Sequence, residues 1–226
     1  MRWWTKPKRA DRSFRKRARE IQQAHRAQTL ASVAELARKY SKPVFGRVET
    51  WSLLERLADC VDPTDIALGG TSQQAHVLQV LEAMERDGVR DEHLRIAALV
   101  HDIGKLLLLT EEPPENVVCF NDPIGDWAPA VGLANCVLQW NHDEFGYSRL
   151  KDHVSEPVAW LVRYHSIRIE ICAPLMDERD REYTERYLRP FQAYDQGSKS
   201  AHHVASRPIA AYRDLLDAAL PRSIVF

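Results

Sequence analysis

Apolar residues recur at helical spacing along most of this chain. Residues 11–40 contain neither proline nor glycine and are rich in Ala, Arg, Gln, Glu and Leu, which predicts one long surface helix. Further helices are expected over residues 50–58, from a Thr71 or Ser72 cap to Asp87-Gly88, from an Asp91 cap to a backbone bend at Gly104, and over residues 131–141, 157–164, 179–194 with a break at Pro190, and 208–219.

The remaining segments carry turn and loop signals. Residues 111–130 contain four prolines, so this stretch is expected to be a loop with at most a small hairpin. Almost no other segment shows the alternation of apolar and polar residues that is typical of a strand. The pattern therefore predicts an all-α fold.

Composition favours one globular domain over residues 1–226. The chain has 226 residues, of which 45% are hydrophobic and 28% charged. The longest apolar runs, residues 96–100 and 106–109, are too short to span a bilayer, so no membrane partner is expected. The four cysteines form no Cys-x-x-Cys pair and no secretory signal opens the chain, which favours a reducing, cytoplasmic location.

Charge is unevenly distributed, although the net charge is only −1. Residues 1–20 hold nine basic and two acidic side chains, a balance of +7 that leaves −8 for the rest. Such a basic N-terminal arm can bind nucleic acid or an acidic membrane. No nucleic-acid motif accompanies it, so we interpret it as a solvated face or arm.

Residues with metal-binding chemistry end the apolar run before Gly104. His101 and Asp102 are about 100° apart around a helix, so both can turn towards one point. There a carboxylate can bridge two cations while the imidazole binds one. An isolated pair of this kind is more often a buried histidine beside an acceptor, and the rest of the chain must decide.

Other histidines and carboxylates lie on or beside apolar helical faces. They are His76, His142, His165 and Asp195. With His101 and Asp102 they form the donor set of a two-metal site inside a helical bundle, and the lack of thiolate favours iron or manganese, with zinc possible. The histidines in polar stretches are expected to be solvated; these are His25, His93, His153, His202 and His203.

The His…His-Asp…Asp pattern resembles the HD-domain superfamily, and His142 and His165 resemble the two further ligands of its dinuclear members. The flanking motifs are similar to one branch, the myo-inositol oxygenase family. They are His76 to Glu82, His101 to Lys105, Trp140 to Phe145, Arg163 to Ser166 and Phe191 to Lys199. The resemblance covers nearly the whole chain.

This resemblance implies an HD-domain bundle that holds two iron ions and uses O₂ to cleave a carbon–carbon bond of a cyclitol or related polyol, by default myo-inositol to D-glucuronate. It implies that His76, His101, Asp102 and Asp195 hold one iron. Asp102 would bridge to a second iron, which His142 and His165 hold and which keeps open positions. The implied substrate contacts are Arg2, Asp62, Thr64, Lys105, Ser166 and Lys199.

Lys105 is also a candidate catalytic residue, alongside Asp102. It would donate to the substrate hydroxyl and help to deprotonate it, and we expect nearby cations to lower the pKa of its ammonium.

Two features depart from the family. Cys119-Phe120 replaces a glycine and a substrate-contacting aspartate, and nearby only Asp122 offers a substitute. The segment between Lys105 and His142 is also shorter than in animal inositol oxygenases. Phe120 therefore predicts one apolar edge in the substrate site, and a bulkier or less hydroxylated relative of myo-inositol competes as substrate.

Two other functions stay open at this point. A dinuclear phosphohydrolase or phosphodiesterase would use the same His101 to Lys105 motif, with two ions that activate water and clamp a phosphate. The related phosphodiesterases carry a Gly-Tyr-Pro signature, whereas Gly146-Tyr147 is followed by Ser148. A non-enzymatic HD-like binding module would lack some of the metal ligands. This sequence has all of them, which argues against such a module.

Overall fold

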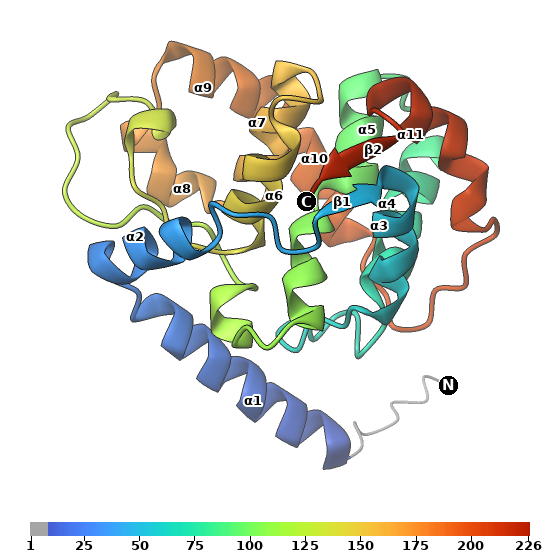
Figure 1. Cartoon of the computed structure of the whole chain (residues 1–226), viewed down its shortest axis with the longest axis horizontal. Helices are drawn as coiled ribbons and strands as arrows, with labels where there is room; N and C mark the ends of the chain where they lie inside the picture. Colours follow the sequence, from blue (N-terminus) through green and yellow to red (C-terminus); the bar gives the residue numbers. More distant parts are fainter. Residues whose placement is uncertain (1–8) are drawn as a thin grey trace, which may run out of the picture.

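The computed structural model describes residues 9–226 (Figure 1). Its α-helices are α1 (Arg9–Arg26), α2 (Leu30–Lys39), α3 (Thr50–Arg56), α4 (Gln73–Arg86), α5 (Glu92–Val100), α6 (His142–Leu150), α7 (Glu156–Tyr164), α8 (Ile169–Cys172), α9 (Glu178–Tyr183), α10 (Arg189–Gly197) and α11 (Arg213–Ala219). Two short antiparallel strands, β1 (Arg47–Glu49) and β2 (Ser223–Val225), pair Val48 with Ile224. The all-α prediction is confirmed.

Helix α5 lies at the centre of the bundle and packs against α4, α7, α10 and α11. Its residues from Ile96 to Val100 are all buried, because neighbours surround the helix on every side. In contrast, α1 runs along the lower left edge of the molecule in Figure 1 and packs on the short turn Pro114–Asn116. No helix among residues 9–226 combines the length and apolarity needed to cross a membrane.

Several predicted helix boundaries are confirmed by side-chain caps. The Ser72 hydroxyl accepts a hydrogen bond from the backbone of Ala75 at the start of α4, and the Asp91 carboxylate accepts one from Leu94 at the start of α5. Helices α3, α7 and α11 also lie where the apolar pattern placed them. Local capping chemistry therefore fixes the elements that surround the centre.

The single helix predicted over residues 11–40 is wrong, because the chain turns between α1 and α2. Thr29 caps α2 in a reciprocal pair with Ser32. The Gln28 side chain leaves the helix path to bind both the backbone carbonyl and the backbone N–H of Trp140. The absence of proline and glycine concealed this turn, since neither capping box nor tertiary contact requires them.

The helix predicted over residues 131–141 is also wrong. This segment contains only a 3-10 turn, Leu133–Asn135, and Leu138 forms an isolated antiparallel bridge with Pro123. The helix starts later, as α6, where the Asn141 side chain accepts from the backbone of Asp143. The α-helix predicted over residues 179–194 is interrupted by a π-helical turn, Thr184–Leu188, just before Pro190.

Gly104 does not mark a bend. It lies in a 3-10 helix, Ile103–Leu109, that packs against the start of α6. A Cβ atom at this position would lie 2.0 Å from the backbone oxygen of His142. Glycine is required there because two backbones approach closely, and this approach places His142 next to His101 and Asp102.

We predict that Gly104→Ala lowers the free energy of unfolding by about 3 kcal/mol, because the added methyl group must push α6 away. Gly146, on the facing side of α6, is the matched control. Its added Cβ would meet only ordinary contacts, the nearest at 3.4 Å to Val162. Gly146→Ala should therefore change stability by less than about 1 kcal/mol. Urea unfolding of both variants measures the difference, and equal effects would contradict the close-approach explanation.

Candidate metal centre

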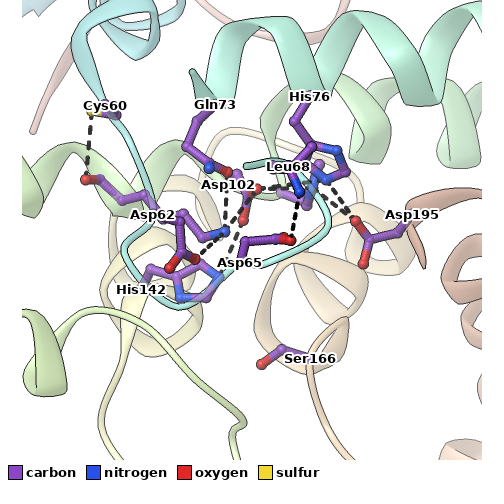
Figure 2. Close-up of polar contacts among 12 residues, drawn as sticks. Cys60, Asp62, Asp65, Leu68, Gln73, His76, Asp102, His142, Ser166 and Asp195 are labelled. Atoms are coloured by element: carbon purple, nitrogen blue, oxygen red, sulfur yellow. Dashed lines mark hydrogen bonds and ion pairs between the residues drawn. The ribbon is translucent and has the colours of Figure 1, made fainter. Parts of the chain in front are cut away.

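The six side chains proposed from the sequence as metal ligands meet in the middle of the bundle. His76 comes from α4, His142 from the first turn of α6 and Asp195 from α10, while His101 and Asp102 follow α5 and His165 follows α7. None of the six residues is more than 3% exposed. Figure 2 shows Asp102 between His142 on one side and His76 and Asp195 on the other.

One carboxylate oxygen of Asp102 faces a first group of donors, which we call site 1. Its Oδ2 atom lies 3.3 Å from Nε2 of His101 and 3.9 Å from Nε2 of His76. The Oδ1 atom of Asp195 completes the group at 2.7 Å from Nε2 of His76 and 3.7 Å from Nε2 of His101.

The other oxygen of Asp102 faces a second group, which we call site 2. Its Oδ1 atom lies 3.2 Å from Nε2 of His142 and 3.6 Å from Nε2 of His165. The two imidazole nitrogens are 3.3 Å apart. Asp102 therefore turns one oxygen towards each pair of histidines, as a carboxylate shared by two cations would.

The hydrogen bonds of the histidines show which ring nitrogen is available. Nδ1 of His101 lies 3.1 Å from the Ala98 carbonyl, Nδ1 of His142 lies 2.8 Å from that of Val117, and Nδ1 of His165 lies 3.1 Å from that of Val162. A carbonyl only accepts, so each Nδ1 carries the proton and each neutral ring turns an Nε2 lone pair towards Asp102.

Lone pairs of nitrogen and carboxylate oxygen thus face one another in a buried space, an arrangement that needs cations between them. Without a metal, protons must supply that charge: burial lowers the pKa of His142, but Asp143 and Asp102 raise it to about 9. Burial opposes ionisation of Asp102, yet His101 and Lys105 hold the pKa of its carboxyl well below the usual range. The donor set fits divalent metal ions.

Lys105 is buried beside the shared carboxylate. Its Nζ atom lies 3.1 Å from Oδ2 of Asp102, 3.1 Å from Oδ2 of Asp62 and 3.1 Å from Oε1 of Gln73. Burial lowers the pKa of this ammonium, but Asp102 and Asp62 outweigh it and raise the pKa above its ordinary value. The protein groups therefore act against the predicted lowering, and Lys105 is a fixed positive charge.

A cavity of about 230 Å³ opens onto the centre. Five of the substrate contacts implied by the resemblance line it, together with Phe120; they are Asp62, Thr64, Lys105, Ser166 and Lys199. His142 and His165 of site 2 also line it, whereas His76 and His101 of site 1 do not. Arg2 lies outside the described residues.

The segment that departs from the family, residues 119–122, has three linked features. Cys119 adopts a φ of 84°, in the left-handed region that glycine favours. Phe120 is 43% exposed, and the guanidinium of Arg168 lies 5.4 Å from its ring centroid. Arg168 also pairs with Asp122, which is absent from the cavity lining. Asp122 therefore does not replace the missing polar contact.

The sequence analysis missed two residues of the site and misplaced a third residue near it. The Oδ1 atom of Asp143 lies 3.0 Å from Nε2 of His142. The sequence carried a signal for this residue, because His142-Asp143 repeats the pair His101-Asp102. Asp65 lines the cavity and its Oδ2 atom lies 2.7 Å from Nζ of Lys199. His25 was placed in solvent, which is wrong.

His25 is 1% exposed and connects α1 to the loop that carries Phe120. Its two ring nitrogens each lie 2.7 Å from a backbone carbonyl, those of Glu115 and Phe120. The signal was the spacing of Ala18, Ile21 and His25, which places all three on one helical face.

Comparison with known proteins assigns the chain to a family. The family model described as myo-inositol oxygenase matches residues 15–125 and 108–226. The chain belongs to the myo-inositol oxygenase family. It is therefore an oxygenase that uses metal, and the family implies a small polyol as substrate.

Relatives within this family come from plants and animals. Inositol oxygenase 5 of Arabidopsis thaliana is 28% identical, with 83% of this chain and 72% of that protein covered. The probable inositol oxygenase of Oryza sativa subsp. japonica is 26% identical, with coverage of 83% and 73%. Inositol oxygenase of Danio rerio is 21% identical, with coverage of 78% and 76%.

We predict that Asp102→Ala removes both metals, because its two oxygens face both sites, whereas His165→Ala weakens chiefly the metal at site 2. Elemental analysis after anaerobic metal loading should give close to zero metals per chain for the first variant and close to one for the second. Circular dichroism confirms that each variant is folded. Full metal occupancy in Asp102→Ala would disprove the shared carboxylate.

Proposed function

We propose that this chain is a non-haem di-iron oxygenase that uses O₂ to cleave a carbon–carbon bond of a cyclitol or related polyol. The observation that carries the proposal is Asp102, whose two oxygens face two separate pairs of imidazoles. The oxidation of myo-inositol to D-glucuronate is the default reaction, because the chain belongs to the myo-inositol oxygenase family.

Site 1, formed by His76, His101 and Asp195 with one oxygen of Asp102, would hold one iron. Site 2, formed by His142 and His165 with the other oxygen of Asp102, would hold the second. When bound, the two iron ions supply the redox chemistry with O₂. Only site 2 presents its histidines to the cavity, which supports substrate binding at that side.

Lys105 is proposed to bind the substrate hydroxyl that lies nearest to the metal centre. Its ammonium is held between Asp102, Asp62 and Gln73, so it does not reorganise when a substrate hydroxyl arrives. A fixed positive charge stabilises the negative charge of a substrate alkoxide at this position. The raised pKa makes Lys105 a hydrogen-bond donor and stabilising charge in this step.

Polar groups around the cavity support a substrate with several hydroxyls. Asp62 accepts from Thr64, Lys199 pairs with Asp65, and Ser166 donates to Asp143, so each side chain is already oriented. A buried polar group that a ligand leaves unpaired costs about 1 to 3 kcal/mol. A hydroxyl-bearing ligand avoids that cost, whereas an apolar one of the same size does not.

Both cavity lysines argue against a phosphate substrate. Lys105 and Lys199 each have a carboxylate partner, Asp62 and Asp65 respectively, so neither is a free cation. A phosphate would have to displace those carboxylates or approach them. A polyol would not meet this repulsion.

The experiment that tests the proposal loads the protein anaerobically with iron and supplies myo-inositol, other cyclitols or sugars before O₂ is admitted. An oxygen electrode and mass spectrometry should record substrate-dependent O₂ uptake and a ring-opened acid. An iron-loaded protein that consumes no O₂ with any polyol would contradict the proposal. Manganese-dependent release of phosphate from nucleotides would favour the phosphohydrolase alternative.

We predict that Lys105→Met lowers kcat by about 100-fold, because the charge that stabilises the alkoxide is lost. Steady-state O₂ uptake measures the change, and elemental analysis should still find both metals. Lys151→Met is the matched control, since Lys151 is exposed at the end of α6. An unchanged kcat in Lys105→Met would exclude Lys105 from the reaction.

We predict that Phe120→Asp lowers KM for myo-inositol by about tenfold, because a carboxylate on this wall restores a hydrogen bond to the ring. Phe120→Asn, which removes the same apolar ring without adding charge, is the control and should give a smaller effect. If KM stays the same or rises in both variants, residue 120 does not contact the substrate.

A further inference from the structure

We propose that the substrate is a cyclitol that carries one apolar substituent, such as an O-alkyl ether, and that Ile66 and Phe120 bind this substituent at the mouth of the cavity. The inference rests on the proposed oxygenase function and narrows its substrate class. It gives a binding role to Ile66, which carries no functional signal in the sequence, and makes Phe120 a specificity-determining residue.

The charged groups of the cavity lie deep. The side chains of Asp62 and Lys105 are each 6% exposed, and those of Asp65 and Lys199 are each 11% exposed. The carboxylates and imidazoles of the metal centre that reach the cavity are at most 5% exposed. The floor of the cavity is therefore polar, and it can bind the hydroxyl groups of a polyol.

The mouth of the cavity has the opposite character. Ile66 and Phe120 line the cavity and are 40% and 43% exposed. Ala67 and Gln196 are the other exposed side chains among the described residues of the lining, so none of the four carries a charge. Exposed apolar side chains next to buried charges reverse the usual order of a protein surface, and apolar patches of this kind mark positions where ligands bind.

Phe120 is held in place at this mouth. Its backbone carbonyl lies 2.7 Å from a ring nitrogen of His25, and the neighbouring carbonyl of Cys119 accepts a hydrogen bond from the Asn141 side chain at 2.9 Å. Cys119 keeps a φ of 84°, which is disfavoured for a residue with a Cβ atom. The Arg168 guanidinium lies against the ring itself. The ring is therefore a fixed part of the cavity wall although it faces solvent.

Ile66 extends from the loop that also supplies polar groups to the floor. Asp62 accepts hydrogen bonds from the backbone and the hydroxyl of Thr64, at 2.8 and 2.7 Å. Asp65 accepts one from the backbone of Leu68 at 3.2 Å (Figure 2). These bonds fix the turn on either side of Ile66. One loop thus presents hydroxyl-binding groups to the floor and an apolar group to the mouth.

An apolar substituent fits this mouth better than a charged or hydroxyl group. A phosphate or carboxylate would need a free cation, whereas Arg168, beside Phe120, is paired with Asp122. A hydroxyl gains nothing from apolar side chains, because water already satisfies its hydrogen bonds. An alkyl group instead removes apolar surface from water on both partners. One added methylene in an apolar site changes specificity by about 10- to 200-fold.

The test measures kcat/KM by O₂ uptake for the iron-loaded protein with myo-inositol and with its mono-O-methyl and mono-O-ethyl ethers. We expect at least one ether to exceed myo-inositol by about tenfold or more, chiefly through a lower KM. Phe120→Ala and Ile66→Ala should each reduce this ratio by about threefold or more, because each removes apolar surface from the mouth. Circular dichroism checks that both variants fold.

Two further variants serve as controls. Phe120→Leu keeps apolar surface at the mouth, so it should retain the preference for the ether. Val204→Ala makes a comparable change at a residue that is 86% exposed and does not line the cavity. This variant should leave the ratio unchanged.

Ethers that react no faster than myo-inositol would overturn the apolar substituent and leave the proposed function intact. An ether preference that is unchanged in both Phe120→Ala and Ile66→Ala would overturn the assignment of these two side chains. O₂ uptake with none of the polyols would overturn the proposed function itself, and this inference with it.

Discussion

The structure depends on one buried carboxylate, Asp102, and on the repulsion that would exist around it without cations. Its oxygens face four imidazoles contributed by different segments, and three of these rings have their Nδ1 proton bound to a backbone carbonyl. Such a set of lone pairs is unfavourable in a packed core unless charge is supplied. The surrounding helices therefore enclose a set of donors suited to cations as well as a hydrophobic core.

Packing brings the distant segments to this carboxylate. Gly104 allows the turn after α5 to touch the backbone of His142, and the Val117 carbonyl accepts from both the backbone and the ring of the same histidine. The loop before α6 is held in turn by Gln28, in the turn that follows α1. Helix α1 thus supports site 2 although it supplies no metal-binding residue.

The sequence could predict which side chains meet at the centre because a histidine on an apolar helical face is conspicuous. His76, His101 and His165 each follow or interrupt a run of buried residues, and the caps Ser72 and Asp91 obey local rules. Tertiary contacts decided the failures. His25 is buried by a loop about 90 residues away, and residues 131–141 form a 3-10 turn and a bridge from Leu138 to Pro123 in place of a helix.

Site chemistry beyond the ligands was also only partly predictable. The replacement of a polar contact by Phe120 is visible in the sequence, but the engagement of Asp122 by Arg168 appears only in three dimensions. Likewise, the pKa of Lys105 depends on Asp62 and Asp102, which lie 43 and 3 residues away in the chain, and on how deeply the ammonium is buried. Local sequence patterns therefore reveal which residues form the site, whereas charge pairs between distant residues set their protonation.

Magnetic coupling between the two bound metals tests the shared carboxylate most directly. Protein loaded anaerobically with manganese(II) should bind two ions per chain and give the electron paramagnetic resonance spectrum of an exchange-coupled pair, because both ions bind oxygens of Asp102. One ion per chain, or two ions with the spectrum of isolated manganese(II), would contradict a dinuclear centre bridged by Asp102.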